Sequence, residues 1–510
     1  MSLSPTAIVL CTLNAKYIHA SLGLRYLLAN MDSLTPHTVL REFTIRRKPS
    51  ELVDELLALS PRIVGFGVYI WNVEQTTVLV RLLKEARPDV KVVLGGPEVS
   101  HEWAEQEVFH LADHLITGWG DLSFPKLCHA LLHGPKPLMK VVVGEQPELD
   151  QITLPYAHYT DADLSHRLLY VEASRGCPFK CEFCLSSLDK TARAFPLEPF
   201  LAEMDALYRR GARNFKFVDR TFNLKVETSA RILQFFLDRL TDGLFVHFEV
   251  IPDHLPDRLK RLIAQFPHGV LQLELGIQTF NAEVQNRISR RQDNDKTVSN
   301  LAWLVDHSQA HLHTDLIFGL PGETLDSFAV GFDRLVALRP QEIQLGLLKR
   351  LRGTPITRHT LVHGMVYDAN PPYTVLQTAV VDAQTVQRFC RLARYWDLIA
   401  NSGRFKTSLP FLLQGPSAFA ALLDCCDWLW HTTGATQGLT PEILVDVLYD
   451  YLTAHKGLPQ QEVQQHLVTD YLASGARARP SSLREVLPRL NPPAAHTRAG
   501  TPAHRQIRHN

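Results

Sequence analysis

Residues 172–184 read EASRGCPFKCEFC, and the three cysteines of this stretch are the most specific feature of the chain. Cys177, Cys181 and Cys184 fall within eight residues, in a C-x3-C-x2-C pattern. Gly176 and Pro178 suit the tight path that such a loop must follow. The spacing therefore predicts that three thiolates turn toward one centre and act as metal ligands.

The number of cysteines indicates which kind of centre to expect. A structural zinc ion normally takes four protein ligands, but no fourth cysteine lies near the motif, and the nearest histidine is His166. An iron-sulfur cluster with one open iron fits three thiolates better. A zinc knuckle completed by a distant histidine, or three unrelated thiols, is the alternative.

The motif directly follows the first of six apolar runs that alternate with helical patterns. Six strand-helix units predict a partial (β/α)6 barrel over residues 167–353, preceded by a polar linker over 144–166. The six predicted strands cover residues 167–174, 214–220, 245–251, 269–277, 311–320 and 342–348.

The first 143 residues carry the same alternation of strands and helices. They predict a Rossmann-like, doubly wound parallel sheet, in which ligands bind at the carboxyl ends of the strands. The predicted strands cover residues 7–13, 37–43, 63–70, 90–96 and 114–118, and the helices 21–31, 50–60 and 75–86. Glycines at two strand ends, Gly95-Gly96 and Gly118 with Gly120, would let a bulky ligand approach the backbone.

Beyond residue 353 the alternation stops. Segments 385–401 and 417–433 have helical periodicity, so residues 354–473 predict a mainly helical C-terminal domain. The fold class is thus α/β followed by a helical region. Residues 474–510 are rich in Pro, Arg, Ala and His, and we expect them to be a disordered tail.

Composition argues against several classes of protein. Lys plus Arg equals Asp plus Glu at 53 each, so no general field draws the chain to nucleic acid or to an anionic membrane. The sequence shows neither a basic leader nor a run of about 18 uncharged apolar residues. We therefore expect neither secretion nor a membrane-spanning segment. Eight cysteines are too sparse for a disulfide scaffold, so we expect a cytoplasmic protein. The five cysteines outside the motif are expected to be buried apolar residues.

The cysteine motif, its place after the first strand and the Phe183 just before Cys184 resemble the radical S-adenosylmethionine (SAM) superfamily. That resemblance implies that the three thiolates hold a four-iron four-sulfur cluster, whose open iron is chelated by SAM. It further implies that one-electron reduction cleaves SAM to a 5′-deoxyadenosyl radical.

Three further segments resemble the same superfamily. Residues 217–223 are similar to an acidic segment of the superfamily, DDTFN, although Arg220 replaces its second acid. Residues 274–278 resemble the segment that contacts the ribose and methionine of SAM. Residues 317–323 resemble the stretch that lies beside adenine. Alternatively, Glu274 is an ordinary buried acid paired with an arginine, and residues 319–322 are a simple turn. The residues that the resemblance places at SAM are Phe183, Asp219, Thr221, Asn223, Glu274, Gln278, Ile317, Gly319 and Gly322.

The first block resembles the N-terminal domain of cobalamin-binding radical SAM proteins, through residues 94–98 and 117–121. Its residues expected at cobalamin are Trp71, Asn72, Gly95, Gly96, Gly118 and Gly120, although Trp71 could equally be partly buried packing. The D-x-H-x-x-G motif that supplies a lower cobalt ligand is not met around His19. We therefore expect His19 to be a loop or helix N-terminal residue. The helical block resembles an uncharacterised domain often found at the end of such proteins.

These resemblances imply a radical SAM enzyme that transfers a methyl group from cobalamin to a carbon of an unknown small-molecule or peptide substrate. Its electrons would come from a donor such as flavodoxin or ferredoxin. One alternative is a radical rearrangement or cyclisation without methyl transfer. Another is a non-catalytic cobalamin or iron-sulfur binding protein. The folded blocks show no basic stripe with aromatic residues, so we do not expect a nucleic-acid partner.

Overall fold

The computed structural model describes residues 4–476 and 478–487. The chain divides into two compact units, and each is made of several segments. The first unit comprises Met1–Glu249, Lys349–Thr357 and Asp368–Thr374. The second comprises Val250–Leu348, Arg358–Tyr367 and Val375–Asn510.

The N-terminal part of the first unit is a sheet of six parallel strands in the order β2-β1-β3-β4-β5-β6. Its strands are β1 (Ile8–Asn14), β2 (Thr38–Thr44), β3 (Ile63–Gly67), β4 (Lys91–Gly95), β5 (His114–Thr117) and β6 (Val141–Val143). Strands β1 and β3 are buried along their whole length, as expected when helices cover both faces of a parallel sheet. The predicted sheet is confirmed, and β6 adds one strand to the five that we predicted.

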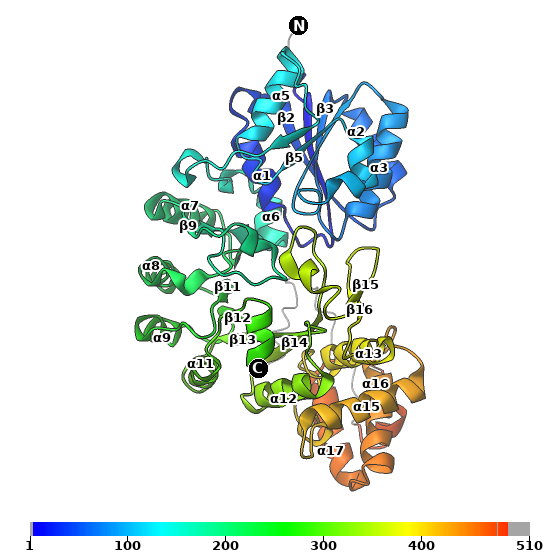
Figure 1. Ribbon diagram of the computed structural model, residues 1–510. Coiled ribbons are helices and arrows are strands. Elements are labelled where there is room, and N and C mark those ends of the chain that lie inside the picture. Colours follow the sequence, from blue (N-terminus) through cyan, green and yellow to red (C-terminus); the bar gives the residue numbers. More distant parts are fainter. Residues whose placement is uncertain (1–3, 477, 488–510) are drawn as a thin grey trace. The chain divides into compact units, whose positions relative to one another are not determined.

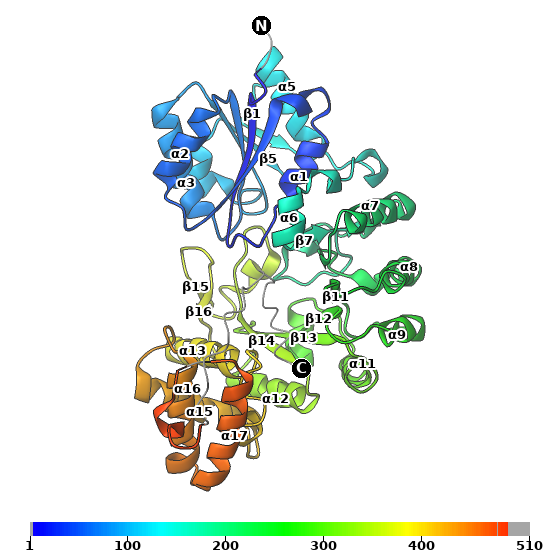
Figure 2. The same ribbon diagram turned by 180° about the vertical axis from the view of Figure 1, so that it is seen from behind.

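Helices cover both faces of this sheet, as Figure 1 and the reverse view in Figure 2 show. Because side chains alternate along a strand, Ile8 and Leu10 pack with α1 (Leu22–Ala29) and α5 (Ser123–His133). Val9 and Cys11 pack on the opposite face with α2 (Pro49–Ala58) and α3 (Val73–Ala86). A fifth helix, α4 (Glu107–Leu111), precedes β5. The arrangement is doubly wound.

The second sheet also has six parallel strands, which follow one another in chain order. They are β7 (Leu169–Val171), β10 (Asn214–Phe217), β11 (Phe245–Val250), β12 (Leu271–Gln278), β13 (His311–Phe318) and β14 (Glu342–Leu347). The intervening helices are α7 (Leu197–Arg209), α8 (Val226–Leu237), α9 (Asp257–Ile263), α10 (Ala282–Arg287) and α11 (Asn294–His307), and α12 (Leu325–Ala337) precedes β14. Five of the strands lie within the predicted ranges, and β12 extends one residue beyond its range, to Gln278; this confirms the fold class of the central region.

The predicted linker, residues 144–166, is an integral part of the first unit. It forms two short 3-10 turns, Leu149–Gln151 and Tyr156–His158, and the helix α6 (Asp161–His166). Tyr156 and Tyr159 of this segment are almost fully buried. Burial of two large aromatic side chains fixes the segment, although its polar composition suggested only a connection.

A buried ion network holds the linker to the N-terminal sheet. Glu42 on β2 accepts from Arg25 on α1 at 2.8 Å and from Arg167 at 2.7 Å. Arg25 also donates to Asp163 on α6 at 2.9 Å. Each of the four side chains is less than a tenth exposed. The positive charges of two guanidinium groups and the negative charges of two carboxylates therefore balance one another in a site that excludes water.

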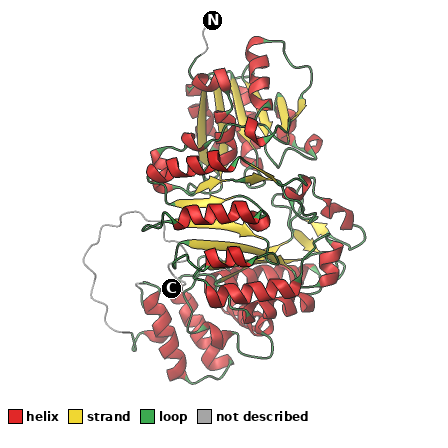
Figure 3. Ribbon diagram, turned by 90° about the vertical axis from the view of Figure 1, so that its left-hand side faces the viewer, coloured by secondary structure: helices red, strands yellow, loops and turns green. Residues whose placement is uncertain are grey.

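The helical region begins later than predicted. After residue 354 the chain forms a 3-10 turn, Pro355–His359, and then an antiparallel hairpin of β15 (Val366–Tyr367) and β16 (Val375–Gln377). The consecutive prolines Pro371 and Pro372 lie inside this hairpin, and proline cannot continue a helix. The helices, red in Figure 3, are α13 (Ala383–Ile399), α14 (Leu409–Leu412), α15 (Ala418–Thr433), α16 (Pro441–Asp450) and α17 (Gln460–Ala473).

Part of the predicted disordered tail is packed. Leu483 and Leu487 are buried, and the Asp446 carboxylate on α16 accepts hydrogen bonds from the backbone of Ser481 and Ser482. These two apolar side chains and one acceptor hold residues 478–487 onto the helical region. Residue 477 and residues 488–510 lie outside the described residues.

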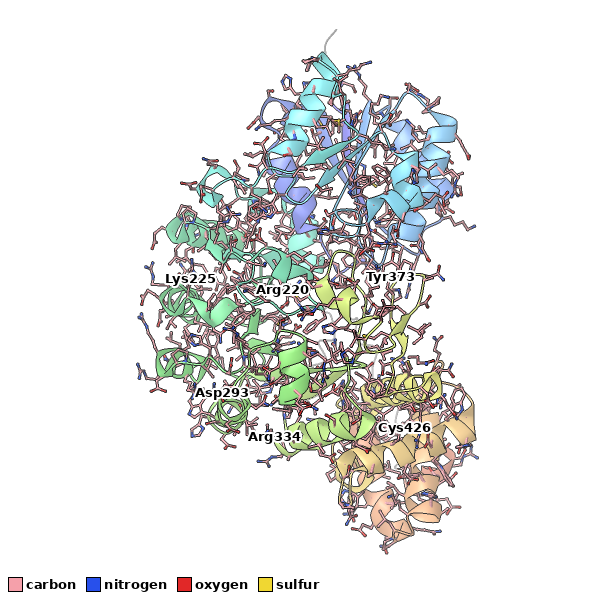
Figure 4. All side chains as sticks on the ribbon, in the orientation of Figure 1. Arg220, Lys225, Asp293, Arg334, Tyr373 and Cys426 are labelled. Atoms are coloured by element: carbon pink, nitrogen blue, oxygen red, sulfur yellow. The ribbon has the colours of Figure 1, made fainter. Side chains whose placement is uncertain are left out.

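Two other expectations concern the whole chain. Among the described helices we find none with the length and apolar character that a bilayer span requires. Four of the five cysteines outside the motif are buried, namely Cys11, Cys128, Cys425 and Cys426 (the last labelled in Figure 4). Cys390 was expected to be buried and is exposed instead, because it lies on the outer side of α13.

Replacing Glu42 by Gln should destabilise the first unit by about 3 kcal/mol, because Arg25 and Arg167 would stay charged and buried without their shared carboxylate. Burial alone would raise the pKa of Glu42, but Arg25 and Arg167 lower it below its usual value. The stabilisation is therefore complete at neutral pH and is lost as the pH falls below about 4.3, the unfolded value.

Urea unfolding followed by tryptophan fluorescence at pH 7 and pH 4 measures both effects. Glu51→Gln is the matched control, because Glu51 pairs with Arg47 at 3.6 Å on the exposed surface and should contribute less than about 1 kcal/mol. Equal unfolding midpoints for wild type and Glu42→Gln at pH 7 would contradict the role of the network.

Candidate cofactor sites

The cysteine motif forms a closed loop just after β7. The loop is closed at its base by a short antiparallel ribbon of β8 (Ser174–Arg175) and β9 (Arg193–Ala194). Cys177 and Cys181 are buried, whereas Cys184 is partly exposed. Phe183 is half-buried in the turn between the last two cysteines. The ribbon therefore holds a compact loop with two buried thiols and one that is partly exposed.

Backbone contacts fix the path of this loop. Gly176 has φ +87°, and a Cβ there would lie 2.2 Å from the Thr191 carbonyl oxygen, so only glycine fits. The amide of Cys177 donates to the Asp189 carbonyl at 2.9 Å. The Ser187 hydroxyl lies 2.9 Å from the Cys181 carbonyl and 2.7 Å from that of Cys184. The loop is thus ordered by the protein chain itself.

The thiols lie within electrostatic range of one another. Burial raises the pKa of Cys177, and the neighbouring Cys184 and Cys181 raise it further. Within residues 4–476 and 478–487, no three His, Cys, Asp or Glu side chains gather tightly enough to hold a single metal ion. In the predicted cluster each thiolate binds a different iron, so it does not require the sulfurs to meet at one ion.

Asp219 supports the cysteine loop from the end of β10. Its carboxylate accepts from the Ala173 amide at 3.0 Å and from the Ser174 hydroxyl at 2.5 Å. Burial raises the pKa of Asp219 to about 7. Asp219 and Thr221 line a small cavity of about 20 Å³ beside Lys225 (labelled in Figure 4). Asp219, which we predicted at SAM, therefore accepts hydrogen bonds from the residues that lead into the cysteine loop.

The neighbouring residues of this segment are also placed. Asn223 is buried in the 3-10 turn Phe222–Leu224. Arg220, the departure from the acidic segment, is half-exposed and holds the Glu249 carboxylate with two contacts of 2.8 Å (Figure 4). Both contacts come from the Nη1 atom of Arg220, whose guanidinium brings a positive charge where the resembling segment has a negative one.

The other predicted SAM residues lie on β12, on β13 and in the turn after β13, all in the second unit. On β12, Glu274 and Gln278 alternate with buried leucines and isoleucine, so both project from the same face. Gln278 has φ +69° at a shift in the strand register, and Arg290 donates to the Gly276 carbonyl beside it. Ile317 lies on β13, next to β12 in the sheet.

The glycine-rich turn after β13 is closely packed. A Cβ at Gly319 (φ +85°) would lie 2.5 Å from Val375, and one at Gly322 (φ +73°) would lie 2.4 Å from Arg287. Glu323 follows, buried, with a contact to the Thr279 hydroxyl, and burial raises its pKa to about 7. Gly322 meets only the flexible end of the Arg287 side chain, so its positive φ is the stronger requirement for glycine, whereas Gly319 is required for close packing against Val375 as well.

Sequence reasoning missed a buried chain of polar side chains on β13 and β14. Glu342 on β14 lies 3.1 Å from His311 and 3.3 Å from His313, and His313 lies 3.2 Å from Asp315. Burial alone would lower the pKa of His313, but Asp315 and Glu342 raise it to about 10. The period-two spacing of His311, His313 and Asp315 was the available signal, although it did not identify Glu342, the partner of the two histidines, which is 29 or more residues away in sequence.

A cavity of about 270 Å³ lies at the carboxyl ends of β3, β4 and β5. Glycines make up much of its wall: Gly65, Gly67, Gly95, Gly96, Gly118 and Gly120, together with Gly23 of α1. A Cβ at Gly96 (φ +109°) would lie 2.4 Å from the Val68 carbonyl oxygen, and one at Gly65 would lie 2.7 Å from the Phe124 ring. The four glycines that we predicted at cobalamin therefore line one cavity.

Trp71 and Asn72 are not among the described residues that line this cavity. Asn72 is fully buried; its amide donates to the carbonyls of Leu13 and Gly67 at 3.0 and 3.2 Å and accepts from the Tyr69 amide at 2.8 Å. Trp71 stacks on Tyr69, with ring centroids 4.5 Å apart. Asn72 thus joins the ends of β1 and β3, and it is Tyr69 that faces the cavity.

His19 lies before the N-cap of α1 and contacts β7 of its own unit. Its Nδ1 atom lies 2.7 Å from the Tyr170 hydroxyl, and its backbone forms a bridge with Leu168. Asp121, Tyr26 and Arg175 are further cavity-lining residues that we did not predict. Their signal was weak, because Asp121 and Arg175 are 54 residues apart in sequence.

Family models match three successive parts of the chain. The B12 binding domain matches residues 8–128 and the Radical SAM superfamily residues 171–333. A protein of unknown function, DUF4080, matches residues 362–499. These matches follow the three predicted blocks in order.

The chain is also similar to several known proteins. It is 29% identical to an uncharacterised methyltransferase of Pyrococcus horikoshii, covering 37% of this chain and 47% of that protein. It is 25% identical to the cobalamin-dependent radical SAM methyltransferase TokK of Streptomyces tokunonensis, covering 58% and 48%. The chain spans about half the length of both relatives.

Among solved structures, the cobalamin-dependent SAM radical enzyme OxsB with aqua-cobalamin bound matches with a TM-score of 0.62 at 14% identity, covering 91% of this chain and 79% of that chain. At this identity the likeness concerns the fold. The B12 binding domain model covers strands of the first parallel sheet, and the Radical SAM model covers strands of the second, so the family matches agree with the fold. The chain therefore belongs to the radical SAM superfamily, as a member with a B12-binding domain in front of the radical SAM domain and a DUF4080 region behind it.

Proposed function

We propose that this protein is a cobalamin-dependent radical SAM methyltransferase that acts on a carbon centre of a small-molecule or peptide substrate. The observation that carries the proposal is that one compact unit contains both a three-cysteine loop and a glycine-lined cavity, and that Arg175 belongs to both. The name of the relative TokK, a cobalamin-dependent radical SAM methyltransferase, supports it.

The cysteine loop has the donor set that the proposal needs. Cys177, Cys181 and Cys184 would hold a four-iron four-sulfur cluster, which when bound supplies the electron that cleaves SAM. The hydrogen bonds of Ser187 and Asp219 order this loop through the chain itself, so its shape does not depend on metal alone. Glu274 and Gln278 offer a carboxylate and an amide from one strand face to bind the polar groups of SAM.

The cavity has the shape that one part of cobalamin needs. Its glycine walls, with the rings of Tyr69 and Trp119, suit a flat aromatic group of the cofactor rather than the whole macrocycle. None of the described residues that line it is a histidine, and His19 is engaged with Tyr170. Cobalamin, when bound there, would supply the methyl carrier, and the protein would contribute no imidazole to cobalt.

Radical rearrangement without methyl transfer, and a non-catalytic carrier, would give different products. Protein that is reconstituted, loaded with hydroxocobalamin and reduced should convert SAM to S-adenosylhomocysteine as well as 5′-deoxyadenosine. 5′-Deoxyadenosine alone would favour rearrangement, and neither product would favour a carrier. We propose flavodoxin or ferredoxin as the electron donor. Metabolite profiling of a deletion strain would identify the substrate.

Anaerobically reconstituted protein should bind about four irons and four sulfides, because three thiolates can anchor one cubane. Changing Cys177, Cys181 and Cys184 together to Ala should abolish binding, as measured by iron and sulfide analysis and by the absorbance of the cluster. Cys390→Ala is the control, since Cys390 is an exposed thiol outside the loop. One equivalent of zinc, with no cluster after reconstitution, would overturn the assignment.

Changing Glu274 to Ala should lower the rate of 5′-deoxyadenosine release by about tenfold or more while the iron content stays the same, because SAM would lose a polar contact. Glu283→Ala, at the exposed start of α10, is the control and should keep the wild-type rate. If Glu274→Ala kept its cluster and cleaved SAM at the wild-type rate, the placement of this strand end at SAM would be wrong.

Changing Gly95 to Leu should abolish uptake of hydroxocobalamin without unfolding the sheet. The nearest atom to a Cβ at Gly95 is the Ile116 carbonyl oxygen at 3.8 Å, so the added side chain has room only by filling the cavity. His19→Ala should bind cobalamin with an unchanged cobalt spectrum. Absorbance titration and electron paramagnetic resonance test both variants; loss of a nitrogen-coordinated signal in His19→Ala would show that His19 is a cobalt ligand.

A further inference from the structure

Arg175 contributes to two sites at once. It ends β8, two residues before Cys177, and its side chain lines the glycine-walled cavity. Its Nη1 and Nη2 atoms donate to the two oxygens of Asp121 at 3.0 and 3.2 Å, and its Nε donates to Glu172 at 2.7 Å. A bidentate contact and a third hydrogen bond fix both the position and the plane of the guanidinium group.

Aromatic rings enclose the same group. The guanidinium carbon lies 4.4 Å from the ring centroid of Tyr26, 4.9 Å from that of Trp119 and 5.4 Å from that of Phe195. The side chain is only 15% exposed, so these cation-π contacts act with little competition from water. The guanidinium group thus has carboxylates in its plane and aromatic rings around it, and it cannot shift without breaking several contacts.

Both strands of the ribbon at the base of the cysteine loop contact the wall of the cavity. Arg193 is the cross-strand partner of Arg175, and its guanidinium lies 4.7 Å from the Trp119 ring centroid. Trp119 belongs to the segment Gly118–Asp121, all four residues of which line the cavity. The wall segment therefore contacts both strands of the ribbon, and within the described part of the chain only Arg175 forms hydrogen bonds with the side chain of its Asp121.

The buried charges give this contact its strength. The side chains of Asp121 and Glu172 are 7% and 11% exposed, and both contact Arg175. Burial raises the pKa of Glu172, and Arg175 opposes that rise. Without Arg175, two buried carboxylates would lose their shared cation, and the wall segment would rearrange to reach water.

We infer that Arg175 is a positioning residue that couples the cobalamin cavity to the cluster-binding loop. A group that fills the cavity and a cluster held by the loop both favour the arrangement in which Arg175 bonds Asp121. The inference rests on the proposed function, since it requires the cavity to take cobalamin and the loop to take a cluster. Coupling between two sites is reciprocal, so the cluster should tighten cobalamin binding by the factor by which cobalamin tightens cluster binding.

The test is the affinity for hydroxocobalamin of the full chain with and without its reconstituted cluster, measured by anaerobic absorbance titration. Wild type should bind about tenfold more tightly when the cluster is present. Arg175→Met should keep its iron content, bind hydroxocobalamin more weakly and show equal affinities in the two states. Arg175→Lys should be intermediate, because an ammonium keeps the charge but cannot make the planar bidentate contact.

A spectrum of the cluster provides a readout that a merely structural role would not change. The electron paramagnetic resonance signal of the reduced cluster is recorded with excess reductant that also holds the added cobalamin as diamagnetic cob(I)alamin; it should change when wild type takes up this cobalamin, and it should not change in Arg175→Met. Arg193→Met is the matched control: it removes the other cation from Trp119, leaves the contact of Arg175 with Asp121 intact and should keep the coupling. If Arg175→Met does not fold, Asp121→Asn replaces it, with the same expected loss.

Equal ratios of affinity in wild type and Arg175→Met, or an unchanged cluster spectrum in wild type, would overturn the inference and leave the proposed function standing. A loss of coupling in Arg193→Met as large as in Arg175→Met would overturn the specific role of Arg175. Wild type that binds no hydroxocobalamin at all would overturn the proposed function itself, and the two failures are therefore distinguishable.

Discussion

The common direction of parallel strands governs where both candidate sites lie. In a parallel sheet every strand ends at the same edge, so the loops that follow the strands gather there. The ends of β3, β4 and β5 provide the glycine wall of the cavity, and the ends of β7 and β10 provide the cysteine loop and Asp219. Both sheets obey the same constraint, and each offers one edge on which a cofactor can be bound.

Buried charge is the second constraint on the first unit. Two buried arginines join segments that are far apart in sequence. Arg175 lies between Asp121 and Glu172. Arg25 lies between Glu42 and Asp163. Each pair is acceptable away from water only when its partners are held in place. Such contacts give little stability relative to an apolar core of the same size, but they select one arrangement of the segments.

Local patterns were enough to predict most of the fold. Apolar runs such as residues 7–13 and 311–320 gave strands, because period and length distinguish them from surface helices. The cysteine motif identified one loop by spacing alone. Contacts between distant residues were not visible: nothing near Asn72 indicated that its amide would be bonded to Leu13 and Gly67. The strand β6 was missed because three valines in a polar stretch give no clear period.

The division of the chain into two compact units has a consequence for its synthesis. The first unit includes residues 349–357 and 368–374, so the chain passes from one unit to the other five times. Tyr373 (labelled in Figure 4), in the last of these segments, donates to the Glu98 carboxylate at 2.6 Å. During translation the N-terminal unit therefore cannot be completed until residue 374 has left the ribosome. Until then, the Glu98 carboxylate lacks its hydrogen bond from Tyr373.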